Sequence, residues 1–133
     1  MNSYQISTDR TRLNTEFIVA ALNTTYWAAG RSREVIEKSL AGSLCFGVYS
    51  ADTRAQVGFA RVVTDRATFA WICDVYVDPA HRAQGLGKRL MTEIVQHPDL
   101  CNVTMYLGTK DAHGLYEKFG FTKWDLMRRA KGG

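Results

Sequence analysis

The sequence has few cysteines, few prolines and no long apolar run. Its three cysteines, Cys45, Cys73 and Cys101, include no C-x-x-C pair, so we expect reduced thiols and no zinc or other metal site. No apolar stretch approaches the ~20 residues that a membrane-spanning helix requires. The first residues carry neither a basic nor an apolar segment, which is typical of a cytoplasmic protein. These absences argue against a disulfide-stapled mini-protein, an integral membrane protein and a secreted protein.

An excess of charge of one sign is also missing. The chain carries 17 basic and 13 acidic residues, for a net charge of +4. The basic residues are scattered along the sequence instead of forming one block. Because scattered basic side chains usually form a solvated surface, we do not expect a nucleic-acid partner.

What is present is typical of one globular domain. The chain has 133 residues, 46% of them hydrophobic, and no linker or low-complexity segment divides it. A chain of this length can bury enough surface to fold without staples. We therefore expect one domain spanning residues 1–133.

The pattern of apolar residues predicts a mixed α/β (α+β) fold. Apolar residues at helical spacing predict two helices at the start, the second capped by Ser32 and ended by Gly42. Three strands rich in β-branched and aromatic residues follow, then a helix, a strand, a short helix and a last strand. The strands and later helices are expected at residues 44–49, 56–63, 69–77, 86–95, 102–107, 111–119 and 121–127. The order ααβββαβαβ predicts a central mixed, mostly antiparallel sheet flanked by helices, with at least one parallel crossover.

A glycine-rich turn over residues 78–88 is the most informative segment. It joins a strand to an amphipathic helix, and unpaired N–H groups at a helix start favour negative charge. Gly85 and Gly87 let an anion approach the backbone, and Arg82 and Lys88 add positive charge. The turn therefore predicts a phosphate-binding site.

Two common phosphate loops do not match this turn. A Walker loop requires glycine at position 82 and serine or threonine at position 89, and arginine occupies both. A dinucleotide fingerprint requires a small residue at position 90, where Leu90 stands.

The remaining pattern, Arg82-x-x-Gly85-x-Gly87, resembles the pyrophosphate signature of the GNAT superfamily of N-acetyltransferases. Residues 75–79 look like the end of that family's fourth strand. Residues 112–121, AHGLYEKFGF, are similar to its Ala-x-x-Leu-Tyr-x-Lys-x-Gly-Phe segment. The resemblance covers residues 44–126 and implies transfer of an acetyl group from acetyl-coenzyme A to a primary amine by direct attack.

The resemblance also implies where the cofactor lies. The pyrophosphate is expected on the loop, and the pantetheine arm on main-chain groups of the preceding strand. Thr109 stands where the family often has an asparagine that contacts the pantetheine. The cofactor residues expected on this basis are Val75, Tyr76, Val77, Arg82, Ala83, Gln84, Gly85, Leu86, Gly87, Lys88 and Thr109.

Two residues are candidates for proton transfer. Tyr116 matches the family tyrosine that can protonate the leaving thiolate, although it could equally be a core residue with its hydroxyl at the rim. Asp74 is the carboxylate within the predicted strand at residues 69–77 and could deprotonate or attract an amine, or could have a structural partner. Strict side-chain alternation predicts that Asp74 faces away from Trp71, Cys73 and Val75.

The acceptor is expected between the N-terminal helices and the sheet, with Tyr26, Trp27 and Arg31 in its wall. A small-molecule amine and a peptide amine both fit this expectation. A non-catalytic module that binds coenzyme A or acyl-coenzyme A as a sensor is the alternative, because the loop by itself only holds phosphate. The last predicted strand, residues 121–127, could offer an edge for pairing in a homodimer.

Overall fold

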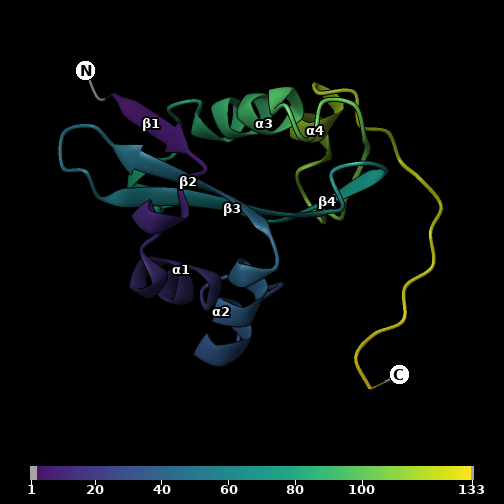
Figure 1. The fold of residues 1–133 in the computed structure, drawn as a ribbon, viewed down its shortest axis with the longest axis horizontal. Helices are drawn as coiled ribbons and strands as arrows, with labels where there is room; N and C mark the ends of the chain where they lie inside the picture. Colours follow the sequence, from purple (N-terminus) through teal and green to yellow (C-terminus); the bar gives the residue numbers. More distant parts are fainter. Residues whose placement is uncertain (1–2, 133) are drawn as a thin grey trace.

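The computed structural model describes residues 3–132, which build a five-stranded sheet with strand order β1-β2-β3-β4-β5 (Figure 1). The first four strands pair antiparallel, and β4 and β5 pair parallel. This confirms the predicted mixed, mostly antiparallel sheet and its parallel crossover. The strands are β1 (Tyr4–Ser7), β2 (Leu44–Ser50), β3 (Gln56–Thr64), β4 (Phe69–Val77) and β5 (Thr104–Leu107).

Helices cover both faces of this sheet, with α3 and α4 on one face and α1 and α2 on the other (Figure 1). Asn14 caps α1 by accepting a hydrogen bond from the Phe17 N–H at 3.1 Å, and Ser32 caps α2 as predicted. The helices are α1 (Thr15–Leu22), α2 (Arg33–Ala41), α3 (Leu86–Gln96) and α4 (His113–Glu117), with short 3₁₀ turns at Arg10–Arg12 and Pro79–His81. Within residues 3–132, no helix has the length and apolar content needed to cross a membrane.

Two cores result from the alternation of side chains across the strands. Phe46 and Ile72 belong to the core that includes residues of α3, whereas Cys45 and Phe59 pack with residues of α1 and α2. Adjacent residues such as Cys45 and Phe46 therefore contribute to opposite faces of the sheet.

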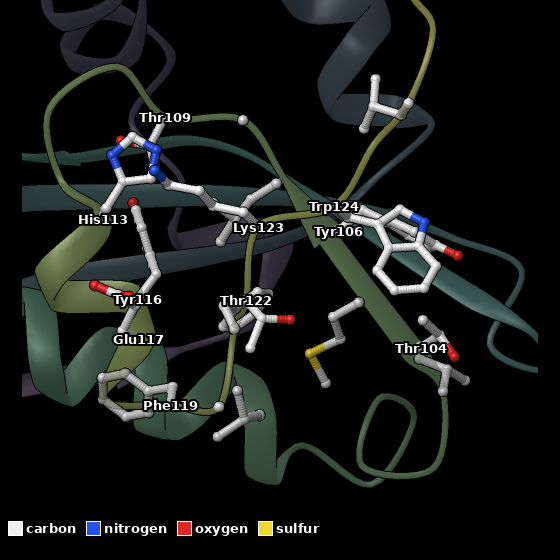
Figure 2. Close-up of a pocket in the computed structure, with 18 of the residues that line it drawn as sticks. Thr104, Tyr106, Thr109, His113, Tyr116, Glu117, Phe119, Thr122, Lys123 and Trp124 are labelled. Atoms are coloured by element: carbon white, nitrogen blue, oxygen red, sulfur yellow. The ribbon is translucent and has the colours of Figure 1, made fainter.

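The observed order of elements corrects the prediction at both ends. Tyr4–Ser7 forms β1, an unpredicted strand that pairs with β2. Residues 121–127 form no strand: Phe121 packs against the core, Thr122, Lys123 and Trp124 pass across β5 (Figure 2), and the chain beyond them runs away from the body of the molecule (yellow in Figure 1). A strand requires a hydrogen-bonded neighbour, and this segment has none in the described part of the chain.

A β-bulge interrupts β4 beside the end of β5. Phe59 pairs with Tyr76, and Arg61 pairs with Cys73, so Asp74 and Val75 lie opposite one residue of β3. Asp74 has φ +55°, a left-handed conformation that non-glycine residues rarely adopt. The bulge changes which face each following side chain of β4 occupies.

Candidate functional site

The strands β4 and β5 separate at one end of the sheet. Their parallel pairing stops at Ile72 and Leu107, whereas β4 continues to Val77. On the side facing away from β3, the main-chain groups of residues 73–77 therefore have no strand partner within residues 3–132. This gap brings the main chain of Val75, Tyr76 and Val77 within reach of a ligand that lies along β4.

The glycine-rich turn follows directly and ends at the start of α3. Gly85 is the N-cap with φ +74°, and no side chain caps the helix start in the described structure. The first helical hydrogen bond runs from the Arg89 N–H to the Gly85 carbonyl at 3.0 Å, so the amides of Leu86, Gly87 and Lys88 precede the helical ladder. These amides form an anion-binding helix terminus.

The space above the two glycines is open. A Cβ atom built on Gly85 would meet nothing within 4 Å, and one on Gly87 would lie 3.8 Å from Leu115 Cδ2. A groove of about 440 Å³ passes over this turn and is lined by Val77, Arg82, Ala83, Gly85, Leu86, Gly87, Lys88 and Leu115. The residues present therefore fit a pyrophosphate group approaching the backbone.

Contacts with β1 and with the end of β4 hold the turn in place. Tyr4 Oη lies 2.9 Å from His81 Nδ1 and donates a hydrogen bond to Gln84 Oε1 at 3.1 Å. Arg82 Nε donates to the Val77 carbonyl at 2.9 Å, which ties the turn back to the end of β4. The sequence did not indicate that Tyr4 contacts the turn, because the strand β1 that positions Tyr4 was not predicted.

Tyr116 and Thr109 lie together at one end of a second, larger cavity of about 830 Å³ (Figure 2). Burial raises the pKa of the Tyr116 hydroxyl, and the nearby Tyr26 and Asp111 add to the shift. Thr109 Oγ accepts a hydrogen bond from the Ala112 N–H at 3.0 Å, immediately before α4. The Thr109 hydroxyl proton is still available for a ligand.

Asp74 is buried and has three donors. Its carboxylate accepts hydrogen bonds from Trp27 Nε1 at 2.9 Å, Arg31 Nη1 at 3.1 Å and Arg61 Nε at 2.9 Å. The prediction that Asp74 faces away from Cys73 was wrong, because the bulge places Asp74 on the same face as Arg61, the strand partner of Cys73. Arg61 was not singled out in the sequence, since a strand arginine carries no motif.

The three residues expected near the acceptor, Tyr26, Trp27 and Arg31, lie close together beside this carboxylate. Tyr26 and Trp27 pack edge to face with ring centroids 5.0 Å apart, and Lys110 Nζ lies 5.1 Å from the centre of the Tyr26 ring. Trp27 and Arg31 are both bonded to Asp74. The connection between α1 and α2 is therefore fixed to β4 and extends toward Tyr116.

Within residues 3–132, no three histidine, cysteine or acidic side chains gather as a metal site would require, and the three cysteines are free. The candidate site therefore consists of an uncapped helix start, unpaired strand main chain, one half-buried tyrosine and a tethered aromatic wall.

The chain resembles known proteins along nearly its whole length. It is 27% identical to a Gibberella zeae protein with an inferred acetyltransferase assignment, over 97% of this chain and 85% of that protein. A crystal structure from Xanthomonas campestris, assigned to the GNAT family, matches with 39% identity, a TM-score of 0.93, and coverage of 98% of this chain and 95% of that one.

A crystal structure of a GNAT acetyltransferase from Elizabethkingia anophelis has acetyl-coenzyme A bound and shares this fold. Its TM-score is 0.66 at 17% identity, covering 93% of this chain and 78% of that one. The sequence profile of the acetyltransferase (GNAT) domain matches residues 42–123, which include β4, the glycine-rich turn, α3 and Tyr116. The cofactor turn, the end of β4 and Tyr116 thus lie inside the matched region, and the chain belongs to the GNAT acetyltransferase family.

Proposed function

We propose that this protein is an N-acetyltransferase that moves an acetyl group from acetyl-coenzyme A to a primary amine by direct attack, without a metal ion. The observation that carries the proposal is the unpaired end of β4 leading into the uncapped start of α3, in a groove that is also lined by Leu115, the chain neighbour of Tyr116. Members of the family generally use acetyl-coenzyme A, which supports acetyl-coenzyme A as the acetyl donor of this protein.

The turn and the strand would hold the donor through their main chain. The amides at the start of α3 face the pyrophosphate, and Lys88 contributes a positive charge at the same end. Main-chain groups of Val75, Tyr76 and Val77 orient the pantetheine arm, and the Thr109 hydroxyl adds a contact. When bound, the thioester supplies the acetyl group.

Tyr116 is proposed to hold the proton that the departing thiolate needs. A phenol is a suitable acid only while it is protonated, and its raised pKa keeps the Tyr116 Oη proton in place throughout the neutral range. The partial burial of the ring also limits competition from water.

Asp74 is proposed to anchor the acceptor wall instead of serving as the base. All three donors bonded to its carboxylate belong to the protein, and two of them are guanidinium groups. These bonds commit the carboxylate to holding the side chains of Trp27, Arg31 and Arg61 in place. The amine proton then passes to water or to a main-chain carbonyl.

Tyr26, Trp27 and Arg31 form the wall against which the acceptor would lie. The acceptor is proposed to be a small-molecule or peptide amine, because both present the same attacking nitrogen. The free cysteines are compatible with the cytoplasm, which is the proposed compartment.

A panel of primary amines, assayed by release of free thiol from acetyl-coenzyme A, tests the proposal. The panel includes polyamines, amino acids, lysine peptides and free peptide N-termini. We expect acceptor-dependent thiol release with at least one class. If the protein binds acetyl-coenzyme A but acetylates no amine in the panel, the non-catalytic sensor is the better description.

A further inference from the structure

The Arg31 guanidinium combines a fixed position with unused hydrogen-bond donors. Its Nη1 donates to Asp74 Oδ2 at 3.1 Å, and within residues 3–132 its Nε and Nη2 have no hydrogen-bond acceptor. The Nε–H and one N–H of Nη2 point the same way along one edge of the planar group. An edge of this kind can bind both oxygens of a carboxylate at once.

The second arginine bonded to Asp74 lacks such a free edge. Arg61 donates through Nε to Asp74 Oδ2 at 2.9 Å and through Nη1 to Ser43 Oγ at 3.2 Å. The Arg61 side chain is 14% accessible, against 24% for Arg31 and 2% for Asp74. Arg61 therefore completes the buried cluster, whereas Arg31 is the member that a ligand can reach.

The charges around this cluster do not cancel. Two guanidinium groups face the single Asp74 carboxylate, which leaves one positive charge in excess in a largely buried position. Lys110 Nζ lies 5.1 Å from the centre of the Tyr26 ring, and its charge is offset by Asp111, the next residue in the sequence. An acceptor that brought only an ammonium group would add to the excess, whereas one with an anionic group would reduce it.

Arg31 also lies beside the strand that would hold the donor. Asp74, to which Arg31 is bonded, immediately precedes Val75, whose main chain belongs to the unpaired end of β4. After burial, the nearby Tyr26 is the next cause of the raised Tyr116 pKa, so the same α1–α2 connection extends toward Tyr116. A group bound to Arg31 would therefore keep the rest of the acceptor close to the donor.

We propose that the acceptor is an amine that carries a carboxylate, as a free amino acid does, and that Arg31 binds this carboxylate through its Nε and Nη2 edge. This acceptor class rests on the proposed acetyl transfer and narrows it. Asp74 takes one donor of Arg31 and so holds the remaining edge in one orientation before the acceptor arrives. Polyamines, which carry only positive charge, are disfavoured.

The carboxylate is unchanged in the transfer. The acceptor nitrogen forms a bond to the acetyl carbon as the carbon–sulfur bond breaks. The proton of the nitrogen passes to water or to a main-chain carbonyl, and the departing thiolate takes the proton of Tyr116, which regains one from water. Arg31 is therefore a residue that determines specificity and positions the acceptor, and it takes no part in proton transfer.

Initial rates of thiol release with matched acceptors test the proposal. The acceptors are the twenty standard amino acids, β-alanine and 4-aminobutyrate, each compared with its primary amide, which keeps the amine and removes the negative charge. Rates are expressed per deprotonated amine, because amidation lowers the pKa of the neighbouring amine. We expect at least one acid to have a kcat/KM at least tenfold above that of its amide.

Arg31→Lys and Arg33→Lys are the matched variants. Lysine at position 31 keeps the positive charge beside Asp74 but loses the flat edge with two donors, whereas Arg33 lies on α2 and pairs with Glu16 and Glu37. Arg31→Lys should lower the acid-to-amide ratio of kcat/KM at least fivefold and leave the value for the amide within about threefold of wild type. Arg33→Lys should leave the ratio unchanged. If Arg31→Lys lowers the rates with acid and amide alike, Arg31 is only structural and the proposal is wrong.

Calorimetric titration of the coenzyme A complex with the same acids and amides separates the carboxylate site from the acetyl transfer. Amides that are acetylated as well as their acids would overturn the carboxylate site and leave the transfer standing. Acids that bind more tightly than their amides, and lose this advantage in Arg31→Lys, would support the site even if none is acetylated, and would then contradict the transfer. If no acid is bound or acetylated at millimolar concentration, the proposal is overturned.

Discussion

At the scale of single residues, the Asp74 carboxylate joins three parts of the chain. It binds Trp27 and Arg31 from the connection between α1 and α2, and Arg61 from β3, while its own strand bulges to present it. The left-handed backbone of Asp74 is a strained conformation that these three bonds help to maintain. We therefore regard Asp74 as the residue that fixes the acceptor wall.

Asp74→Asn should lower the free energy of unfolding by about 2–3 kcal/mol, because it leaves the Arg31 and Arg61 guanidinium groups without a counter-charge in a largely buried site. Urea unfolding measures this loss, and Glu37→Gln, which breaks the exposed pair with Arg33, is the control with little expected effect. The acceptor KM should rise. A stable variant with a large loss of kcat and an unchanged acceptor KM would instead identify Asp74 as the base.

Tyr116→Phe should lower kcat by roughly 10² or more, since it removes the proposed proton donor while keeping the ring packed against Phe121. The affinity for acetyl-coenzyme A should stay within about twofold of wild type. Tyr106→Phe is the matched control, because Tyr106 lines the same cavity and has no proposed role in proton transfer. Equal kcat values for the two variants would remove Tyr116 from the mechanism.

The rate should rise from pH 6 to pH 9, because an alkylammonium acceptor with a pKa near ~10 must lose its proton before it attacks. The Tyr116 pKa is raised, so its neutral, donating form persists to higher pH than for an ordinary tyrosine, and no decline is expected in this range. Initial rates at saturating acetyl-coenzyme A measure the profile. A decline between pH 8 and pH 9 would contradict the assignment of a high-pKa acid.

At the scale of elements, the turn before α3 combines two glycines with different tasks. Gly85 has a left-handed backbone, so any other residue there is strained by about 1 kcal/mol. Gly87 lies in the first turn of the helix, where a Cβ meets only ordinary contact with Leu115. Substitution of Gly87 therefore tests ligand access without testing the fold.

Gly87→Val should weaken acetyl-coenzyme A binding at least tenfold with little loss of stability, since the branched side chain projects into the groove where a phosphate would approach. Calorimetric titration gives the affinity. Gly42→Val at the end of α2 is the control, because a Cβ there meets only the Lys38 carbonyl at 3.9 Å. Unchanged affinity in Gly87→Val would mean that the phosphates bind elsewhere.

The sequence predicted the elements that have strong periodicity or clear ends. The α3 helix and the three central strands carry long apolar patterns, and Ser32 marks the start of α2. The strand β1 was missed because Tyr4–Ser7 is short and its place in the sheet depends on pairing with β2, a contact distant in sequence. Residues 121–127 have a strand pattern without a strand partner in the described chain, so the pattern alone was misleading.

The cofactor turn could be identified from the sequence because its signature is local. The surroundings of Asp74 could not be predicted from the sequence. The prediction of which sheet face Asp74 occupies assumed that side chains alternate strictly along β4, and a bulge shifts that alternation. Arg61 lies on a different strand, so its ion pair with Asp74 depends on the β3–β4 register. The residue types around Asp74 could be read from the sequence, but the register between β3 and β4 could not.

At the scale of the whole molecule, the site spans the two layers of the fold. The glycine-rich turn leads into α3 on one face of the sheet, whereas the acceptor wall comes from the α1–α2 connection on the other (Figure 1). The separation of β4 from β5 provides a passage between them. This arrangement suits a direct transfer in which both substrates are present together.

The central claim is that the start of α3 and the free end of β4 hold acetyl-coenzyme A. Isothermal titration of the 133-residue chain with acetyl-coenzyme A tests it most directly. We expect saturable binding with one molecule per chain, weakened at least tenfold in Gly87→Val and unaffected in Gly42→Val. Absence of binding at millimolar acetyl-coenzyme A, with the protein folded, would contradict it.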